Sequence, residues 1–212
     1  MTLLFVPLED AARTILPLQQ RARKTRAALL HTVERLVADE SEAAVTTTRV
    51  AAEAAVSVGA VYRYFPDREA LLLDAYDATV ARIVAHCSAA LDALPDGMGR
   101  EDAARALLGA YLEAALAIPA HSGLLRAMRR IRPVEADFDA NEDRVASGIL
   151  TPFLARFVPE AADAPPDRLH FLNVLLGSLV DLYLVTEGEA ARTRLRADIE
   201  AHMLLALERA AG

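Results

Sequence analysis

Three observations on the sequence predict an all-α protein with a packed core. Alanine and leucine dominate the composition, apolar residues recur every three or four positions in several long segments, and no segment alternates apolar and polar residues as a strand would. The hydrophobic content of 54% and the mean hydropathy of +0.21 are sufficient for a packed interior.

The N-terminal segment is expected to be irregular and to precede a helix. Pro7 and Pro17 would interrupt a helix, so residues 1–19 are predicted to form a flexible arm. Over residues 20–39 apolar side chains fall on one helical face, which predicts a helix that packs against a neighbour.

Two short helices joined by a tight turn are predicted next. The run Thr46 to Thr48 offers an N-cap for the first, which ends at Ala54. The turn covers residues 55–57, and the second helix runs from about Ser57 to Phe65 before Pro66. A longer helix followed by two short ones around a tight turn is the frame of a DNA-reading helix-turn-helix.

The remaining chain is predicted to be a larger helical domain. Asp67 is the expected N-cap of a long helix whose apolar pairs keep one broad face buried. Five further helices, separated by segments rich in proline or glycine, are expected at about 101–118, 121–131, 136–157, 166–186 and 190–210. The predicted domains are therefore residues 20–66, after the arm, and residues 67–212.

Charge is distributed unevenly between these two parts. The formal net charge is −7, yet residues 20–68 carry eight basic and six acidic side chains and are therefore net positive. A small basic segment joined to an acidic body is typical of a DNA-binding domain followed by another domain.

The stretch from Thr46 to Leu71 carries the most specific signal. It reads Thr46-Thr47-Thr48-Arg49-Val50-Ala51-Ala52-Glu53-Ala54-Ala55-Val56-Ser57-Val58-Gly59-Ala60-Val61-Tyr62-Arg63-Tyr64-Phe65-Pro66-Asp67-Arg68-Glu69-Ala70-Leu71. This stretch resembles the TetR family of bacterial repressors, and the resemblance is dense across residues 24–72. It implies an N-terminal three-helix DNA-binding domain and a C-terminal helical domain that binds a ligand and dimerises.

Contacts to DNA are expected from the second short helix and its surroundings. Small side chains at its start would let the helix N-terminus approach the major groove, and Arg63 can make a bidentate contact with guanine. By resemblance, the hydroxyls of Tyr62 and Tyr64 would bond phosphates, and Arg68 would hold a phosphate where the family usually has lysine. The expected DNA-binding residues are Arg21, Arg23, Lys24, Thr47, Thr48, Arg49, Ser57, Val58, Gly59, Ala60, Tyr62, Arg63, Tyr64 and Arg68.

Two positions depart from the family pattern. Ser41 and Ala55 stand where family members usually have glycine. A non-glycine residue in a left-handed turn costs roughly 1–2 kcal/mol, so the turn at Ala55 is expected to be strained or reshaped.

The resemblance also implies that the last two long helices form a four-helix bundle between two copies. The expected interface residues are Leu169, Leu172, Leu176, Leu179, Val180, Tyr183, Met203, Leu204 and Leu207. The alternative is that these side chains are simply buried within one subunit.

A cavity among the body helices is implied as the site of a small-molecule effector. Polar or adaptable side chains in apolar surroundings are its candidates, namely Tyr111, His121, Met128, Arg129, Phe138, Asn141, His170, Asn173 and Asp181. For His121 the alternative is a helix cap after Pro119. An anionic effector could bind Arg126, Arg129, Arg130 and Arg132, and the alternative is that these are solvated or paired with Glu135 and Asp137. For Asn173 and Asp181 the alternative is a polar contact across the dimer.

The expected function is therefore a repressor that binds a palindromic double-stranded operator as a homodimer and is released by an unidentified effector. No phosphate-binding glycine loop, Gly-x-Ser-x-Gly or His-Glu-x-x-His sequence is present, so no enzymatic activity, metal or cofactor is expected. A helical adaptor that has lost DNA binding is the alternative. Cys87, the only cysteine, is expected to be buried filler, with a redox role as its alternative.

A cytoplasmic, nucleoid-associated location without a membrane partner is expected. No apolar run is long enough to span a bilayer, and the first residues lack a signal-peptide pattern.

Overall fold

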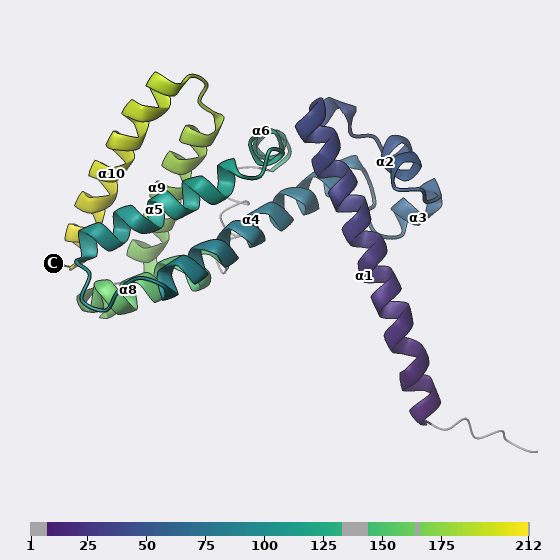
Figure 1. Cartoon of the computed structure of the whole chain (residues 1–212), viewed down its shortest axis with the longest axis horizontal. Coiled ribbons are helices and arrows are strands. Elements are labelled where there is room, and N and C mark those ends of the chain that lie inside the picture. The colour runs from purple at the N-terminus through teal and green to yellow at the C-terminus, as the bar shows by residue number, and fades with distance from the viewer. Residues whose placement is uncertain (1–7, 133–143, 164–165, 212) are drawn as a thin grey trace, which may run out of the picture.

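The computed structural model describes the backbone at residues 8–132, 144–163 and 166–211, and the side chains at 19–132, 144–161, 168 and 170–209. Every regular element in these ranges is helical, which confirms the all-α prediction (Figure 1). Phe138 and Asn141 lie outside the described residues, and so does the side chain of Leu169.

The N-terminal helix is longer than predicted. Helix α1 runs over Leu8–Asp39 and projects away from the body (Figure 1), so the prediction of an irregular segment is wrong from Leu8 to residue 19. An interior proline removes one backbone hydrogen bond but does not have to end a helix, and Pro17 lies between two good helix formers, Leu16 and Leu18.

The two predicted short helices are α2, Thr47–Glu53, and α3, Val58–Tyr62. Each begins at a side-chain cap: Thr46 Oγ1 accepts the Arg49 amide at 3.1 Å, and Ser57 Oγ accepts the Ala60 amide at 3.1 Å. Buried side chains hold both helices against α1 and α4 (Arg68–Asp92), and these include Leu29, Val33, Val50, Val61 and Phe65. A short 3-10 turn, η1 (Glu42–Ala44), joins α1 to α2.

The turn after α2 has the strain expected at Ala55. Ala55 has a φ of +53°, and it is the only non-glycine residue with positive φ in the described ranges. The Val56 amide donates to the Ala51 carbonyl at 3.0 Å and the Ala55 amide to the Ala52 carbonyl at 3.2 Å. This pair of bonds is the Schellman arrangement, which normally places glycine at this position.

Replacing Ala55 by glycine is therefore expected to raise the free energy of unfolding by about 1 kcal/mol. Loss of the Cβ atom relieves the left-handed strain, and the greater freedom of glycine in the unfolded chain offsets part of that gain. Urea denaturation followed by circular dichroism measures the change. Ala54→Gly is the matched control, because Ala54 has a φ of −82° and should only lose stability. Equal loss in both variants would contradict the strain at Ala55.

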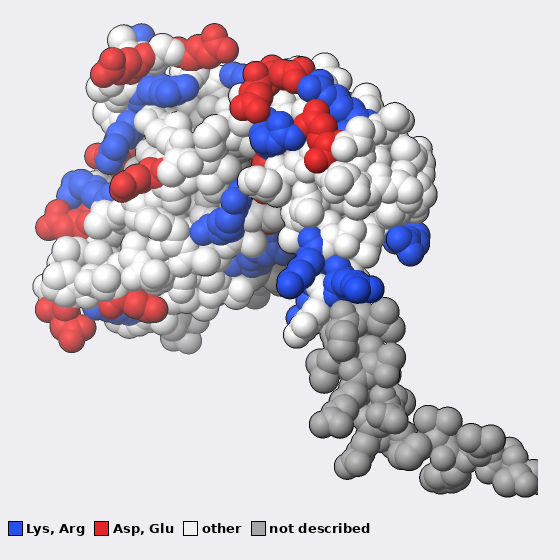
Figure 2. Space-filling model, turned by 45° about the vertical axis from the view of Figure 1, so that its right-hand side comes forward, with Lys and Arg blue, Asp and Glu red and all other residues white. Residues whose placement is uncertain are grey.

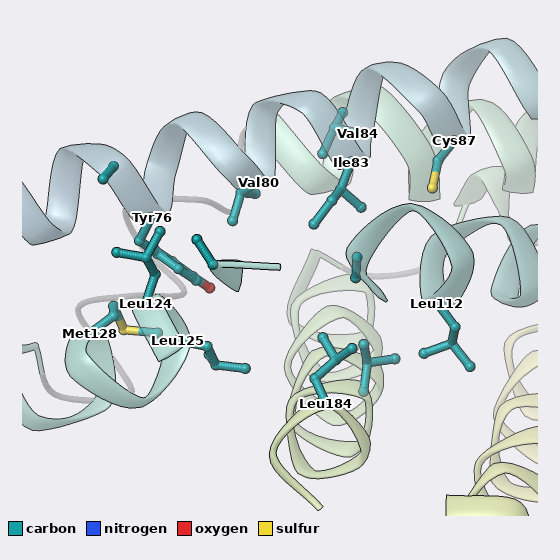
Figure 3. Packing of buried hydrophobic residues seen from close by; sticks show 14 of the residues in the cluster. Tyr76, Val80, Ile83, Val84, Cys87, Leu112, Leu124, Leu125, Met128 and Leu184 are labelled. Carbon is teal, nitrogen blue, oxygen red and sulfur yellow. The ribbon is translucent and has the colours of Figure 1, made fainter. Parts of the chain in front are cut away.

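Helix α4 begins at the predicted cap, where Asp67 Oδ1 accepts the Ala70 amide at 2.8 Å. It packs along α5 (Arg100–Leu116) and α6 (His121–Ile131), which are bent by 91° relative to each other. Figure 3 shows Tyr76, Val80 and Ile83 of α4 directed toward the side chains of α6 and α5. Cys87 belongs to this core, and burial raises the pKa of its thiol to about 12, which disfavours a reactive thiolate.

The C-terminal part of the body consists of two long helices and a shorter helical segment that contains a π-helical turn. Residues 144–157 are helical and include one π-helical turn, η2 (Ala146–Leu150), before α8 (Thr151–Phe157) and the 3-10 turn η3 (Pro159–Asp163). Helices α9 (Pro166–Val185) and α10 (Glu189–Ala211) then pack together beside α5. The predicted boundaries of α5, α6, α9 and α10 are confirmed to within two residues.

Among the described residues, no single helix is long and apolar enough to cross a membrane, and only the bent pair of α5 and α6 reaches that length and composition together.

Candidate functional site

The exposed side of α3 is the centre of the candidate DNA-binding surface. Ser57, Val58 and Gly59 are exposed at its start, and the open space beside Gly59 leaves this end of the helix accessible. Tyr62, at 54% exposure, and Arg63 extend the same side one turn later. The Tyr62 hydroxyl lies 3.4 Å from Thr47 Oγ1, so the ends of α2 and α3 present adjacent hydroxyl groups.

Ala60 and Tyr64 are oriented differently from the predicted set. Ala60 is 7% exposed and faces the core beside Val61, so it cannot approach a base edge. Ala60 follows Gly59 on a helix of five residues. So short a helix has no clear apolar periodicity, and the sequence therefore could not show which of these small residues faces inward. Tyr64 is half-buried against the core and stacks at a tilt on Phe65 with ring centroids 6.4 Å apart.

Basic side chains of α1 lie close to this surface. Arg21, Arg23 and Lys24 are all exposed on α1. Figure 2 shows basic side chains gathered where the described side chains of α1 begin, on the side of the molecule that carries α2 and α3. The net positive charge of residues 20–68 is thus partly concentrated beside the short helices.

Arg49 is held in a network of acidic side chains. Its guanidinium donates to Glu53 Oε1 at 2.9 Å and to Glu40 Oε2 at 2.9 Å. The hydrogen bonds from Arg49 hold the pKa values of both carboxyls below their usual range. A phosphate would therefore compete with two carboxylates for Arg49, which sequence analysis did not indicate.

Arg68 has an internal structural role. Its Nε donates to the Val45 carbonyl at 2.7 Å and one terminal nitrogen donates to the Glu42 carbonyl at 2.5 Å. These bonds attach the η1 turn to the start of α4. Two of its three guanidinium nitrogens thus form hydrogen bonds within the protein. The phosphate contact of Arg68 that the resemblance implies stays a prediction.

The body contains a cavity of about 160 Å³ between α4, α5, η2, α8, α9 and α10. Its lining is predominantly apolar and consists of Tyr76, Val80, Ala104, Leu107, Leu108, Tyr111, Val145, Ile149, Leu150, Phe153, Asn173, Leu176, Gly177, Val180, Asp181, Ile199, Met203 and Leu207. Of the predicted ligand-binding residues, Tyr111, Asn173 and Asp181 are brought together here.

Asp181 and Arg129 form an ion pair at one side of this cavity, between α9 and α6. Arg129 therefore contacts the cavity residue Asp181 but does not itself line the cavity. The neighbouring arginines are also paired, Arg126 with Glu187, Arg130 with Glu42 and Arg132 with Asp77. Glu135 and Asp137, the acids expected to pair with them, lie outside the described residues.

His121 and Met128 belong to the core of α6. His121 is 2% exposed, its Nδ1 lies 2.7 Å from Thr79 Oγ1, and its ring stacks on Tyr76 with centroids 5.8 Å apart. Burial, with a contribution from the charge of Arg82, lowers the pKa of His121 to about 4. Neither His121 nor Met128 lines the cavity, and His121 is not a helix cap. His170 is exposed on α9, also outside the cavity.

Most of the predicted dimer residues face inward. Buried within the subunit are Leu172, Val180, Tyr183, Met203 and Leu207, while Leu176, Leu179 and Leu204 are half-buried. The prediction is wrong for the buried five. Because α9 is apolar on more than one face, its periodicity cannot show which face is internal.

The exposed apolar side chains of α9 and α10 are instead Phe171 at 59%, Leu182 at 51% and Leu205 at 46% exposure. Phe171 and Leu205 also line a groove between the two helices. Sequence analysis missed these three residues. It also missed the contributions to the cavity of α4, of α8 and, apart from Tyr111, of α5. Side chains that line a cavity have the same apolar spacing as side chains that fill a core.

The chain was compared with known proteins. A family model described as bacterial regulatory proteins, tetR family, matches residues 29–75. No curated protein matches the sequence.

Several solved structures share the fold. A TetR-family regulator from Streptomyces coelicolor is 19% identical with a TM-score of 0.63, over 88% of this chain and 99% of that one. A TetR regulator from Rhodococcus sp. RHA1 is 20% identical with a TM-score of 0.61, over 87% and 96%. The TetR family repressor AlkX from Dietzia sp. strain DQ12-45-1b, implicated in biodegradation of n-alkanes, is 16% identical with a TM-score of 0.61, over 88% and 97%.

Residues 29–75 overlap α1 to α4, which contain the helix-turn-helix, and the structural likeness extends through the body. The family predicted from residues 24–72 is confirmed: this chain carries the DNA-binding domain of the TetR family of bacterial regulatory proteins and has the fold of TetR-family transcriptional regulators.

Proposed function

We propose that the protein is a homodimeric transcriptional repressor that binds a palindromic operator and is released by a small molecule bound in its cavity. The observation that carries the proposal is the exposed side of α3, where Tyr62 and Arg63 follow an accessible helix start beside the basic side chains of α1. This combination suits insertion of α3 into the major groove with phosphate contacts on either side.

Dimerisation is proposed because one α3 helix reaches only a few base pairs. Two copies of the helix-turn-helix, spaced by one helical turn of DNA, recognise a palindrome. The apolar face of Phe171, Leu182 and Leu205 is the surface we assign to the second copy, since exposed apolar side chains on two adjacent helices lose water when they pack on their equivalents.

Release by an effector is proposed from the position of the cavity. Tyr76 and Val80 of α4 line it, and α4 begins in the DNA-binding domain at Arg68. A molecule that binds only one placement of α4 would shift the population of that placement. The Dietzia relative is described as a repressor, and a repressor in the cytoplasm, on the nucleoid, is the role proposed here.

Selection of bound duplexes from a random library, with the purified protein at two salt concentrations, tests the proposal. An enriched palindrome whose binding weakens with salt is expected, because each neutralised phosphate contributes about −0.9 to the slope of log K against log salt. Absence of both enrichment and salt-dependent binding would contradict a DNA-binding role and favour an adaptor that binds protein.

Arg63→Ala is expected to flatten the base preference at one position of each half-site. A bidentate contact with guanine contributes roughly 1–3 kcal/mol of discrimination, which alanine removes. Binding to the selected operator and to single-base variants, measured by fluorescence anisotropy, checks this. Arg68→Ala is the comparison variant. It should weaken binding to all sequences alike, because it releases η1 from α4. An unchanged base preference in Arg63→Ala would remove Arg63 as a base reader.

A further inference from the structure

The cavity contains a buried polar side chain to which no described residue makes a hydrogen bond. Asn173 is 8% exposed and lines the cavity from α9. No described residue forms a hydrogen bond with its side-chain amide, whereas Tyr111 and Asp181, also in the lining, do have interactions within the protein. Buried amides are nearly always hydrogen-bonded, so the amide of Asn173 is suited to a partner that enters the cavity.

The charges around the cavity disfavour an ionised ligand. Asp181 is the only charged residue in the described lining, and its carboxylate is paired with Arg129 of α6. An anion would be repelled by Asp181 and would have to lose its hydration shell in apolar surroundings. A cation would meet a carboxylate whose charge is already offset, so it too would recover little of its desolvation cost.

The size of the described cavity suits a compact molecule. Apolar cavities of about 150 Å³ in proteins accommodate benzene, and this cavity has a volume of about 160 Å³. Its walls include Leu107, Ile149, Phe153 and Val180, which offer only dispersion contacts to a ring or short chain.

We propose that the cavity selects an uncharged, compact apolar molecule with a single hydrogen-bonding group, such as a hydroxyl or carbonyl, that pairs with the amide of Asn173. This ligand class deepens the proposed function, since it rests on the cavity being the effector site. It also distinguishes the ligand from a plain hydrocarbon, which would leave the amide unpaired, and from carboxylic acids and amines.

Four probes that share one ring and differ in one substituent test the proposal: benzyl alcohol, toluene, benzoate and benzylamine. Isothermal titration of the full-length protein should show benzyl alcohol binding roughly 3- to 10-fold more tightly than toluene, the contribution of one neutral hydrogen bond. Benzoate and benzylamine should bind more than about tenfold more weakly than benzyl alcohol, because each is charged at neutral pH.

Asn173→Leu should abolish the advantage of benzyl alcohol over toluene while toluene still binds. Ser178→Ala, an exposed residue of α9 outside the cavity, is the control and should retain the full order of affinities. A charged probe that binds as tightly as benzyl alcohol, a preference that survives Asn173→Leu, or no binding of any probe would each overturn the ligand class.

Operator binding, measured separately without probes, distinguishes this proposal from the proposed function. If DNA is bound and no probe is, the regulator stands and the ligand class fails. If benzyl alcohol binds in the predicted order to a protein without DNA binding, the ligand class stands and the repressor fails.

Discussion

Replacing both Phe171 and Leu182 by glutamate is expected to leave the protein monomeric and to weaken operator binding by about a hundredfold or more. The two side chains are 59% and 51% exposed and lie eleven residues apart, about three turns, on one side of α9. Carboxylates there would face their own equivalents across a two-fold interface, where burial of like charges is unfavourable. Two linked DNA-binding domains bind roughly 10²- to 10⁴-fold more tightly than a single one, and a monomer loses that gain in affinity.

Analytical ultracentrifugation gives the oligomeric state of this double variant, and anisotropy with full-site and half-site duplexes gives its affinities. Leu116→Glu is the matched control, because Leu116 is 47% exposed at the end of α5 and is not part of the proposed interface. The control should remain dimeric. A double variant that stays dimeric would mean that the interface lies elsewhere. A monomer with undiminished operator affinity would contradict operator binding by two linked DNA-binding domains.

Phe65→Ala is expected to lower the free energy of unfolding by about 3–5 kcal/mol, the usual cost of truncating a buried phenylalanine. Phe65 is 1% exposed and follows α3, where it packs in the core formed with α1 and α4. The guanidinium of Arg26 on α1 lies 5.6 Å from its ring centroid, so the ring also makes a cation–π contact. Thermal and urea denaturation followed by circular dichroism measure the loss.

Tyr62→Ala is the matched control for Phe65→Ala, because Tyr62 is an exposed aromatic side chain three residues earlier. Because Tyr62 is 54% exposed, its loss should change the free energy of unfolding by less than about 0.5 kcal/mol. It should nevertheless weaken DNA binding, since its hydroxyl is proposed to contact phosphate. A stability loss in Tyr62→Ala comparable to that of Phe65→Ala would mean that the assignment of Tyr62 as exposed and Phe65 as buried is wrong.

Local signals explain why most element boundaries could be predicted from the sequence. Asp67 caps α4 as expected, and the proline- and glycine-containing segments separate α4, α5 and α6 where predicted. The strain at Ala55 could also be predicted, since a conformation that suits glycine is occupied by alanine. In each case a few adjacent residues determine the conformation.

Features that depend on which helix packs where could not be predicted in the same way. The inward position of Ala60 and the inward faces of Leu172 and Met203 depend on neighbours distant in sequence. His121 is a further example, since its contacts with Thr79 and Tyr76 join α6 to α4 across more than forty residues. Pro17 shows the opposite error, where a local signal was given too much weight against a helix that continues through it.

The attachment of Arg68 to the η1 turn has a mechanical consequence. Helix α4 is a continuous rod from Arg68 to Asp92, with Val80 at the cavity and Arg68 fixed to the carbonyls of Glu42 and Val45. The arm from Val80 to Arg68 is about 18 Å long at 1.5 Å per residue, so a tilt of about 10° at the cavity displaces Arg68 by about 3 Å. Because Arg68 is hydrogen-bonded to η1, a tilt of α4 about the cavity would carry η1, and the short helices that follow it, along with this end of α4.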